Sequence, residues 1–226
     1  MTSEIEIIFE DQHLIVLNKP VGLLSQEDHE KEENLVSLLR EHFGRHYVGL
    51  VHRLDRNTSG IMVVAKRSKS AERLTKALQE GHLQREYLAF LWGKLTRPER
   101  WNHWLSKDSE TNKVKAYLHK TAGTKEAVLK VTPVKSTSWK NQTLTLAHFI
   151  LETGRSHQIR AQAAAQSYPV VGDIKYGKKE TATLDKQFGR PALHSWKLEF
   201  PHPMSKEMMK FEASMPQDMK TLEKGK

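Results

Sequence analysis

Between residues 84 and about 152 the chain consists almost entirely of short β-prone runs, and this stretch constrains the fold more than any other feature. The runs are rich in aromatic and β-branched residues and are separated by Pro, Gly, Asn and Ser, the pattern of strands joined by turns. They read REYLAFLWGKL, WNHWLSKD, NKVKAYLHK, EAVLKVTPVK and QTLTLAHFILE. Consecutive strands of this kind predict a large antiparallel or mixed sheet.

The flanking sequence adds a strand hairpin and several helices. The opening segment IEIIFEDQHLIVLNKPVG has two apolar runs around a polar turn, which predicts a hairpin. Helical spacing of apolar residues predicts helices over 34–43, over a segment capped by Ser68, and over about 156–166. We therefore expect an α+β fold: a mixed, mainly antiparallel sheet with flanking helices and a central active-site cleft.

The domain organisation follows from what the sequence lacks. It contains no internal repeat, no low-complexity linker and no break in composition. We therefore predict one catalytic domain over residues 1–214. The remaining residues, 215–226, are mostly polar and are predicted to form a flexible C-terminal tail.

Charge and residue usage limit the possible functions. The chain has 36 Lys plus Arg against 27 Asp plus Glu, a net charge of +9, which favours polyanionic partners such as nucleic acid but can equally serve solubility. The absence of cysteine excludes disulfides, thiolate metal sites and a cysteine nucleophile. No apolar run approaches the roughly 18 residues of a membrane span, and the acidic N-terminus is unlike a secretory signal. These features favour a cytoplasmic protein without a membrane partner.

The segment HRLDRNTSG, residues 52–60, concentrates the chemically versatile side chains. It places an acid, two arginines and two hydroxyls on a tight connection between two β-prone runs, where side chains can reach a ligand while the sheet holds the loop. Taken alone, an Asp beside Arg in a turn is more often an Asx cap or a local ion pair.

The segment HRLDRNTSGIMVVAK resembles the motif that defines the RluA family of pseudouridine synthases. Further segments follow the order of that family, between residues 7 and 203: LNKPVGLLS, REYLAFLWG, ETGRSHQIR, YPVVGDIKYG and LHSWKLEFPHP. The resemblance implies a pseudouridine synthase catalytic domain that isomerises uridines in structured RNA, either ribosomal or transfer RNA. It implies no cofactor and no metal, and a monomer is expected.

The resemblance also implies roles for individual residues. Asp55 would be the catalytic carboxylate, Tyr87 would pack against the target base, and Arg160 would pair with Asp55. An arginine suits this task because its planar fork can hold a carboxylate through two hydrogen bonds. A uridine inside stacked RNA must be turned out of the stack to react, and Arg53 is expected to contact the substrate during that step.

Three further residues of the motif have two open interpretations. His52, Thr58 and Ser59 are candidate substrate-binding residues by the resemblance. As turn residues they can equally shape the loop by bonding to nearby backbone groups.

The chain departs from the family pattern in two places. Members often have a His two residues beyond the position of Arg160, where this chain has Gln162, preceded by Ala161. The core begins almost at residue 4, so an S4-type RNA-binding domain is not expected before it, and substrate selection would come from the catalytic domain itself.

Other patterns in the sequence bear on alternative functions. His42 and His46 lie four apart on a predicted helix and could face one metal ion, but no third ligand accompanies them. A nucleophile elbow, a GxxxxGK[ST] loop and a GxGxxG turn are absent from the sequence. Two alternatives stay open: a non-catalytic RNA-binding or ribosome-assembly protein on the same fold, and a hydrolase that uses Asp55 to activate water.

Overall fold

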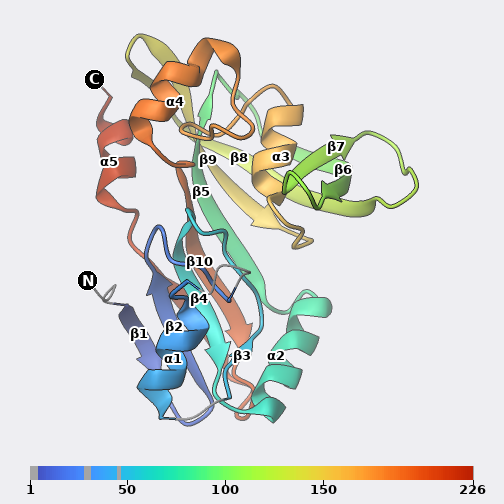
Figure 1. Cartoon of the computed structure of the whole chain (residues 1–226), viewed down its shortest axis with the longest axis vertical. Helices are drawn as coiled ribbons and strands as arrows, with labels where there is room; N and C mark the ends of the chain where they lie inside the picture. Colours follow the sequence, from blue (N-terminus) through green and yellow to red (C-terminus); the bar gives the residue numbers. More distant parts are fainter. Residues whose placement is uncertain (1–4, 28–31, 45–46, 226) are drawn as a thin grey trace. The chain divides into compact units, whose positions relative to one another are not determined.

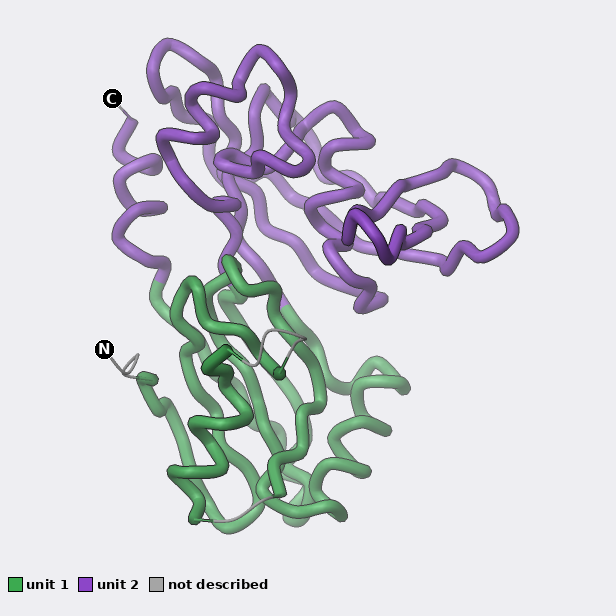
Figure 2. Tube along the Cα trace, in the orientation of Figure 1, with its two compact units in different colours: residues 1–85, 195–214 green, residues 86–194, 215–226 purple. Residues whose placement is uncertain are grey.

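The computed structural model describes residues 5–27, 32–44 and 47–225. The chain divides into two compact units, Met1–Arg85 with Ser195–Ser214 and Glu86–His194 with Met215–Lys226 (Figure 2). It passes from one unit to the other inside strand β5 (Gln84–Trp92), inside strand β10 (Leu193–Pro201) and again between Ser214 and Met215. The sequence predicted one domain over 1–214 because a crossing inside a strand leaves no linker and no change in composition.

Unit 1 contains a β-sheet with two helices (Figure 1). Its strands follow the order β1-β2-β4-β10-β11, with the short strand β3 beside β4. The elements are β1 (Glu6–Glu10), β2 (Leu14–Lys19), α1 (Leu35–Phe43), β3 (Gly49–Leu50), β4 (Ser59–Ala65), α2 (Ser68–Gln79) and β11 (Met208–Glu212).

The central strands of unit 1 are buried on both faces. All of β4 is buried, as is nearly all of β2, which explains their continuous apolar sequences, LIVL and IMVVA. On one face, Leu74 and Ala77 of α2 pack against Leu14, Val63 and Phe200. This two-sided burial holds the start of β4, and with it the preceding loop, in a fixed position.

The two helices of unit 1 begin differently from each other. Asn34 caps α1 through a hydrogen bond from the Ser37 amide, and Gly44 ends the helix in the left-handed conformation at φ 60°. The prediction that Ser68 caps α2 is wrong, because Ser68 is already helical and Arg67 occupies the cap position without a side-chain bond. The run YVGLVHRLD forms only the two-residue strand β3, since the chain then turns into the loop that precedes β4.

Unit 2 contains a second set of antiparallel strands in the order β5-β9-β8-β6-β7. Its further elements are β6 (Glu99–Asp108), β7 (Lys113–Tyr117), β8 (Lys125–Trp139), β9 (Gln142–Leu151), α3 (Gln158–Ala165), the 3-10 helix η1 (Lys179–Thr181), α4 (Ala182–Phe188) and α5 (Gln217–Lys224). The β-prone runs of the sequence correspond to β5 through β9, which confirms the α+β class with a mixed, mainly antiparallel sheet.

Local chemistry accounts for the longest hairpin of unit 2. Strands β8 and β9 pair up to Trp139 and Gln142, so Lys140 and Asn141 form a two-residue turn. Both turn residues have positive φ, 49° and 61°, the conformation that matches the twist of a hairpin. On one face of this sheet, Ala161 of α3 packs against Leu105, Val114 and Ala127, and this contact fixes the helix that carries Arg160.

The C-terminal segment corrects the sequence prediction of a flexible tail over 215–226. Residues 217–224 form helix α5, with Met219 and Leu222 buried. An ion pair adds to this packing, because Asp218 accepts hydrogen bonds from Nε and Nη2 of Arg190 at 2.6 and 2.8 Å. No helix among the described residues is long and apolar enough to cross a lipid bilayer.

Candidate active site

The HRLD segment forms a loop that a second loop holds in place through backbone hydrogen bonds. Ser25 Oγ donates to the Leu54 carbonyl at 2.8 Å and accepts from the Leu54 amide at 3.2 Å. The Gly22 amide donates to the Arg56 carbonyl at 2.9 Å. The residues on either side of Asp55 are therefore anchored to the loop that follows β2, and this leaves little backbone freedom at Asp55 itself.

Lys19 reinforces this connection from inside unit 1. Its side chain is fully buried, and Nζ donates to the carbonyls of Pro20, Leu23 and Arg56 at 2.8, 2.7 and 3.2 Å. Three carbonyl acceptors match the three donors of an ammonium group, which makes its burial tolerable. Lys19 of the LNKPVGLLS segment thus anchors the candidate catalytic loop through its hydrogen bond to the Arg56 carbonyl.

The two arginines of the HRLDR sequence have different environments. Arg56 Nε donates to the Gly22 carbonyl at 3.1 Å, and its Nη2 lies 2.7 Å from a carboxylate oxygen of Glu32. Arg56 is therefore part of the loop scaffold. Arg53 is exposed, the environment that a substrate-contacting arginine needs.

Asp55 lies at a tight turn at the end of the loop. Its carbonyl accepts a hydrogen bond from the Thr58 amide at 3.0 Å, and the residue is half-buried. Thr58 and Ser59 are buried where β4 begins. Gly60 follows with φ +118°, and a Cβ there would lie 2.1 Å from the Ser195 carbonyl oxygen, so the TSG sequence needs its glycine. The burial of Thr58 and Ser59 favours the interpretation that they shape the loop.

His52 is enclosed in the core of unit 1. Its Nε2 accepts a hydrogen bond from the Val63 amide at 3.2 Å. Burial, and then the nearby charge of Arg85, lowers the pKa of His52 to about 3, so the ring is neutral at physiological pH. A buried neutral ring bonded to β4 also fits a structural role.

Tyr87 is a buried residue of β5 in unit 2. Its Cα partner in the ladder is Phe149 of β9, and the Phe149 ring in turn contacts Trp101 edge-on, with centroids 5.8 Å apart. Neighbouring side chains of a strand point to opposite faces. Glu86 accordingly lies on the other face, where it bonds to His148 Nε2 at 2.7 Å.

Arg160 is held by a buried carboxylate and an aromatic ring. Its Nε and Nη2 donate to the two carboxylate oxygens of Asp173 at 2.6 and 2.9 Å, a bidentate pair. Asp173 is fully buried and also accepts from the amides of Lys175 and Tyr176 at 3.1 and 3.2 Å. The Arg160 guanidinium carbon lies 5.2 Å from the centre of the Tyr176 ring.

Tyr176 is itself anchored by two hydrogen bonds. Its hydroxyl accepts from the Val114 amide at 2.8 Å and lies 2.8 Å from Nδ1 of His157. His157 precedes α3 in the left-handed conformation, φ 50°. Arg160, Asp173, Tyr176 and His157 therefore form one connected cluster, the Arg160 cluster, which presets the direction of the guanidinium.

Comparison with known proteins identifies the family. The model of the RNA pseudouridylate synthase family matches residues 13–165, more than half of the chain. Ribosomal large subunit pseudouridine synthase D of Nitrosomonas europaea is 34% identical over 231 residues, which cover 96% of this chain and 64% of that protein. The chain belongs to the RNA pseudouridylate synthase family. The resemblance in the HRLD segment is thereby confirmed.

Other relatives agree with this assignment. The uncharacterized RNA pseudouridine synthase YjbO of Bacillus subtilis is 34% identical over 98% of this chain and 76% of its own length. The solved structure of human RNA pseudouridylate synthase domain containing 1 superposes with a TM-score of 0.77 at 22% identity, covering 93% of this chain and 83% of that one. This structural likeness shows that the fold is shared. The chain spans just under two thirds of the Nitrosomonas protein.

In this family member the predicted site residues are distributed over both units. His52, Arg53, Asp55, Thr58 and Ser59 lie in unit 1, whereas Tyr87 and Arg160 lie in unit 2. The ion pair expected between Asp55 and Arg160 stays a prediction. The pair of Arg160 with Asp173 was not predicted. The sequence signal for this pair was Asp173 in the YPVVGDIKYG segment. That segment resembles the family, but the resemblance assigned no role to its aspartate.

The departure at Gln162 concerns packing within unit 2. Gln162 is fully buried, and its Nε2 lies within hydrogen-bonding distance of the carbonyls of Trp101 and Ala127, at 3.2 and 3.1 Å, and of His103 Nδ1 at 3.0 Å. It is therefore directed at the sheet. Gln162 thus helps to seat α3 on the sheet, and its side chain is separate from the Arg160 cluster.

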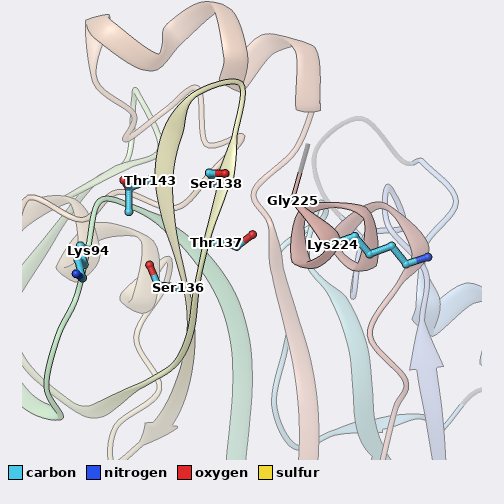
Figure 3. Close-up of a pocket in the computed structure, with 7 residues that line it drawn as sticks. All are labelled: Lys94, Ser136, Thr137, Ser138, Thr143, Lys224 and Gly225. Atoms are coloured by element: carbon cyan, nitrogen blue, oxygen red, sulfur yellow. The ribbon is translucent and has the colours of Figure 1, made fainter.

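A polar recess in unit 2 is a separate feature. Lys94, Ser136, Thr137, Ser138, Thr143, Lys224 and Gly225 surround a polar recess of about 480 Å³ where α5 meets β8 and β9 (Figure 3). Neither Tyr87 nor Arg160 lines it. His42, considered as a metal ligand, bonds to Glu10 at 2.9 Å, and its supposed partner His46 lies outside the described residues.

Proposed function

We propose that this chain converts specific uridines to pseudouridine in structured RNA, with Asp55 as the catalytic carboxylate. The observation that carries the proposal is the anchoring of the HRLD loop. Ser25, Gly22 and Lys19 bond to the backbone on both sides of Asp55, while the Asp55 residue stays half-buried. A carboxylate on a fixed loop is suited to react with a bound nucleotide, because its position costs no reorganisation.

The reaction is an isomerisation and needs no redox partner. The bond between C1′ and N1 of the uracil breaks, the base rotates, and a bond forms between C1′ and C5. The hydrogen on C5 is lost and N1 gains one, so the atoms balance within the nucleotide. A carboxylate can assist by attacking C1′, attacking C6 or abstracting a sugar proton, and all three leave Asp55 as the reacting group.

Arg160 is proposed to support the carboxylate form of Asp55. Its two hydrogen bonds to Asp173 account for two of the five N–H donors of a guanidinium. The Arg160 cluster thus orients a positive charge in advance, and a preset charge stabilises a buried anion better than a mobile one. Asp173 and Tyr176 act here as positioning residues.

Tyr87 is proposed to stack on the target base, and Arg53 is proposed to contact the RNA around it. A target uridine must leave its stack at a cost of a few kcal/mol, and an aromatic ring offers the extruded base a stacking surface. Arg53 is exposed on the same loop as Asp55 and can contact the RNA around the vacated position. His52, Thr58 and Ser59 hold the loop that carries both residues.

Ribosomal RNA is the first substrate class to test. Several relatives are named ribosomal large subunit pseudouridine synthase D, and transfer RNA is the alternative. We propose that the protein acts without a cofactor and as a monomer. Site-resolved mapping of pseudouridine in both RNAs, from cells with and without the gene, would identify the modified position.

The decisive test is the Asp55→Asn variant with purified protein and an RNA transcript. We expect no pseudouridine from it, because an amide cannot replace the carboxylate, and unchanged RNA affinity. Asp108→Asn, which changes the aspartate at the end of β6, serves as the matched control and should keep full activity. Substantial pseudouridine formation by Asp55→Asn would remove Asp55 from this role.

The same assay separates the alternative functions. A non-catalytic RNA-binding protein would bind the transcript and leave every uridine unchanged. A hydrolase would release free uracil and leave an abasic site, which chromatography of the nucleosides detects. Pseudouridine without free uracil is the outcome expected from the proposed function.

A further inference from the structure

A short loop of unit 2, residues 172–177, carries two members of the Arg160 cluster. These members are Asp173 and Tyr176. The chain that leads into the loop pairs with β5, where the Val171 amide donates to the Phe90 carbonyl at 2.8 Å. Beyond Val171, the position of Asp173 depends on other contacts of the loop.

Asp185 of α4 contacts this loop at both ends. Its Oδ1 accepts a hydrogen bond from the Gly172 amide at 2.7 Å. At the other end, a Cβ on Gly177 would lie 2.7 Å from Asp185 Oδ2 and 2.6 Å from the Asp173 carbonyl oxygen. The Gly177 amide donates to that carbonyl at 2.6 Å. The Asp185 carboxylate therefore lies against both of the glycines between which Asp173 and Tyr176 are held.

The backbone of Gly172 is confined from a second side. Its φ is +79°, and a Cβ there would lie 1.9 Å from the Arg190 carbonyl oxygen and 2.6 Å from the Phe188 ring. Gly172 is thus enclosed between the Arg190 backbone and the Asp185 carboxylate. Asp173 is the next residue, so this confinement is passed directly to the partner of Arg160.

Asp185 is a buried acid that hydrogen bonds alone stabilise. It is 1% exposed, and among the described residues it forms no ion pair with a lysine, arginine or histidine. Besides the Gly172 amide, Trp92 Nε1 donates to Oδ1 and Thr181 Oγ1 to Oδ2, each at 2.8 Å. A buried acid of this kind needs its donors at fixed positions. The amide that precedes Asp173 is one of these three donors.

We propose that Asp185 is a positioning residue for the reaction. By fixing the loop 172–177 it sets, through Asp173, the direction of the Arg160 guanidinium. The two bonds between Arg160 and Asp173 are 2.6 and 2.9 Å long, so a small shift of the loop either breaks a bond or moves the guanidinium. This inference rests on the proposed function, in which Arg160 supports the carboxylate form of Asp55.

The first test measures turnover of an RNA transcript by Asp185→Ala, which removes all three hydrogen bonds. We expect kcat to fall about tenfold and KM to stay within about twofold, because a displaced guanidinium affects the reacting carboxylate and leaves the surface that binds RNA unchanged. Asp185→Asn should recover most of the activity. Its oxygen can accept from Gly172 and Trp92. Its NH2 group can donate to the Thr181 hydroxyl, which itself donates to the Lys178 carbonyl at 3.3 Å.

The matched control is Met219→Ala, because it also removes a fully buried side chain of unit 2. It should lose stability and keep the wild-type kcat at a temperature where both variants are folded. If Asp185→Ala does not fold, Asp185→Ser takes its place, since the serine hydroxyl falls short of the Gly172 amide but can reach it through a water. A wild-type kcat in the folded variant, or an equal loss of kcat in Met219→Ala, would overturn the inference.

The NMR signal of the Arg160 Nε–H group reports on the guanidinium without RNA. Its absence in Arg160→Met assigns it. In the wild type we expect one sharp signal, shifted to low field by the 2.6 Å bond to Asp173. Asp173→Asn and Asp185→Ala should both move or broaden it, whereas Met219→Ala should leave it unchanged. An unaltered signal in Asp185→Ala would also overturn the inference.

The two measurements separate this inference from the proposed function. If the wild type forms pseudouridine and Asp185→Ala forms it at the same rate, the function stands and the inference fails. If the wild type forms no pseudouridine but the Arg160 signal changes in Asp185→Ala, the positioning of Arg160 by Asp185 stands and the proposed function fails.

Discussion

Buried cationic side chains serve different purposes in this protein. Lys19 donates hydrogen bonds to three carbonyls, and Arg160 donates two to Asp173. Lys19 fixes a loop, and Arg160 is proposed to present a charge to Asp55. The hydrogen-bond partners of each side chain, rather than its burial alone, distinguish these roles.

The Asp173→Asn variant tests the Arg160 cluster. Replacing one carboxylate of a buried bidentate pair leaves Arg160 uncompensated, so we expect roughly 3 kcal/mol lower stability in urea unfolding. We also expect at least a tenfold lower kcat with little change in KM, because the guanidinium loses its preset direction. Asp218→Asn breaks the analogous pair with Arg190, but Asp218 is 41% exposed, so the loss should be about 1 kcal/mol with normal kcat. Equal kcat in both variants would contradict the positioning role.

His52 should make the stability of the protein depend on pH. Its pKa is about 3 when folded, against 6.5 for an ordinary histidine, so between these values the unfolded chain binds the extra proton. The contribution of the neutral His52 ring to the free energy of unfolding is therefore fully present above pH 6.5. As the pH falls below 6.5, this contribution declines by up to about 1.4 kcal/mol per pH unit. Urea unfolding of wild type and His52→Gln at pH 7.5, 6.5 and 5.5 checks this. The variant should show the shallower decline, and identical slopes would refute the assignment.

At the scale of elements, the C-terminal helix α5 contributes to unit 2 although its sequence is mostly polar. Met219 and Leu222 are buried, and Thr137 Oγ1 lies 3.5 Å from the Leu222 carbonyl. We expect Met219→Ala to lower the free energy of unfolding by about 3 kcal/mol, since it removes a fully buried side chain. The exposed neighbour Lys220→Ala should change it by less than about 0.5 kcal/mol. Equal unfolding midpoints for the two variants would show that α5 does not pack as described.

The elements that were predictable from sequence are those with several local signals in agreement. The β8–β9 hairpin combines two apolar runs with a polar turn, and α1 combines helical spacing with Asn34 and Gly44. Helix α5 escaped prediction because only Met219 and Leu222 mark its inner face, too few for a periodic pattern. Whether such a segment forms a helix depends on its tertiary packing, which the sequence of the segment alone does not reveal.

The candidate site was predictable where it is contiguous and unpredictable where it depends on folding. Asp55 and its neighbours form one motif, so their shared loop could be expected. Asp173 lies 13 residues from Arg160, and only the folded chain brings their side chains together. Lys19 and Arg85 were not singled out because lysine and arginine are usually exposed, and burial is a property of the whole unit.

At the scale of the whole molecule, the excess of 36 basic over 27 acidic residues should govern how RNA binds. Each phosphate that a basic side chain neutralises releases counterions, so affinity falls as salt rises. If only three phosphates are contacted, raising the salt from 50 to 200 mM weakens binding roughly forty-fold. Fluorescence anisotropy with the Asp55→Asn protein measures this without turnover. A salt-independent affinity would mean that the positive charge serves solubility, and that stacking and base contacts alone hold the RNA.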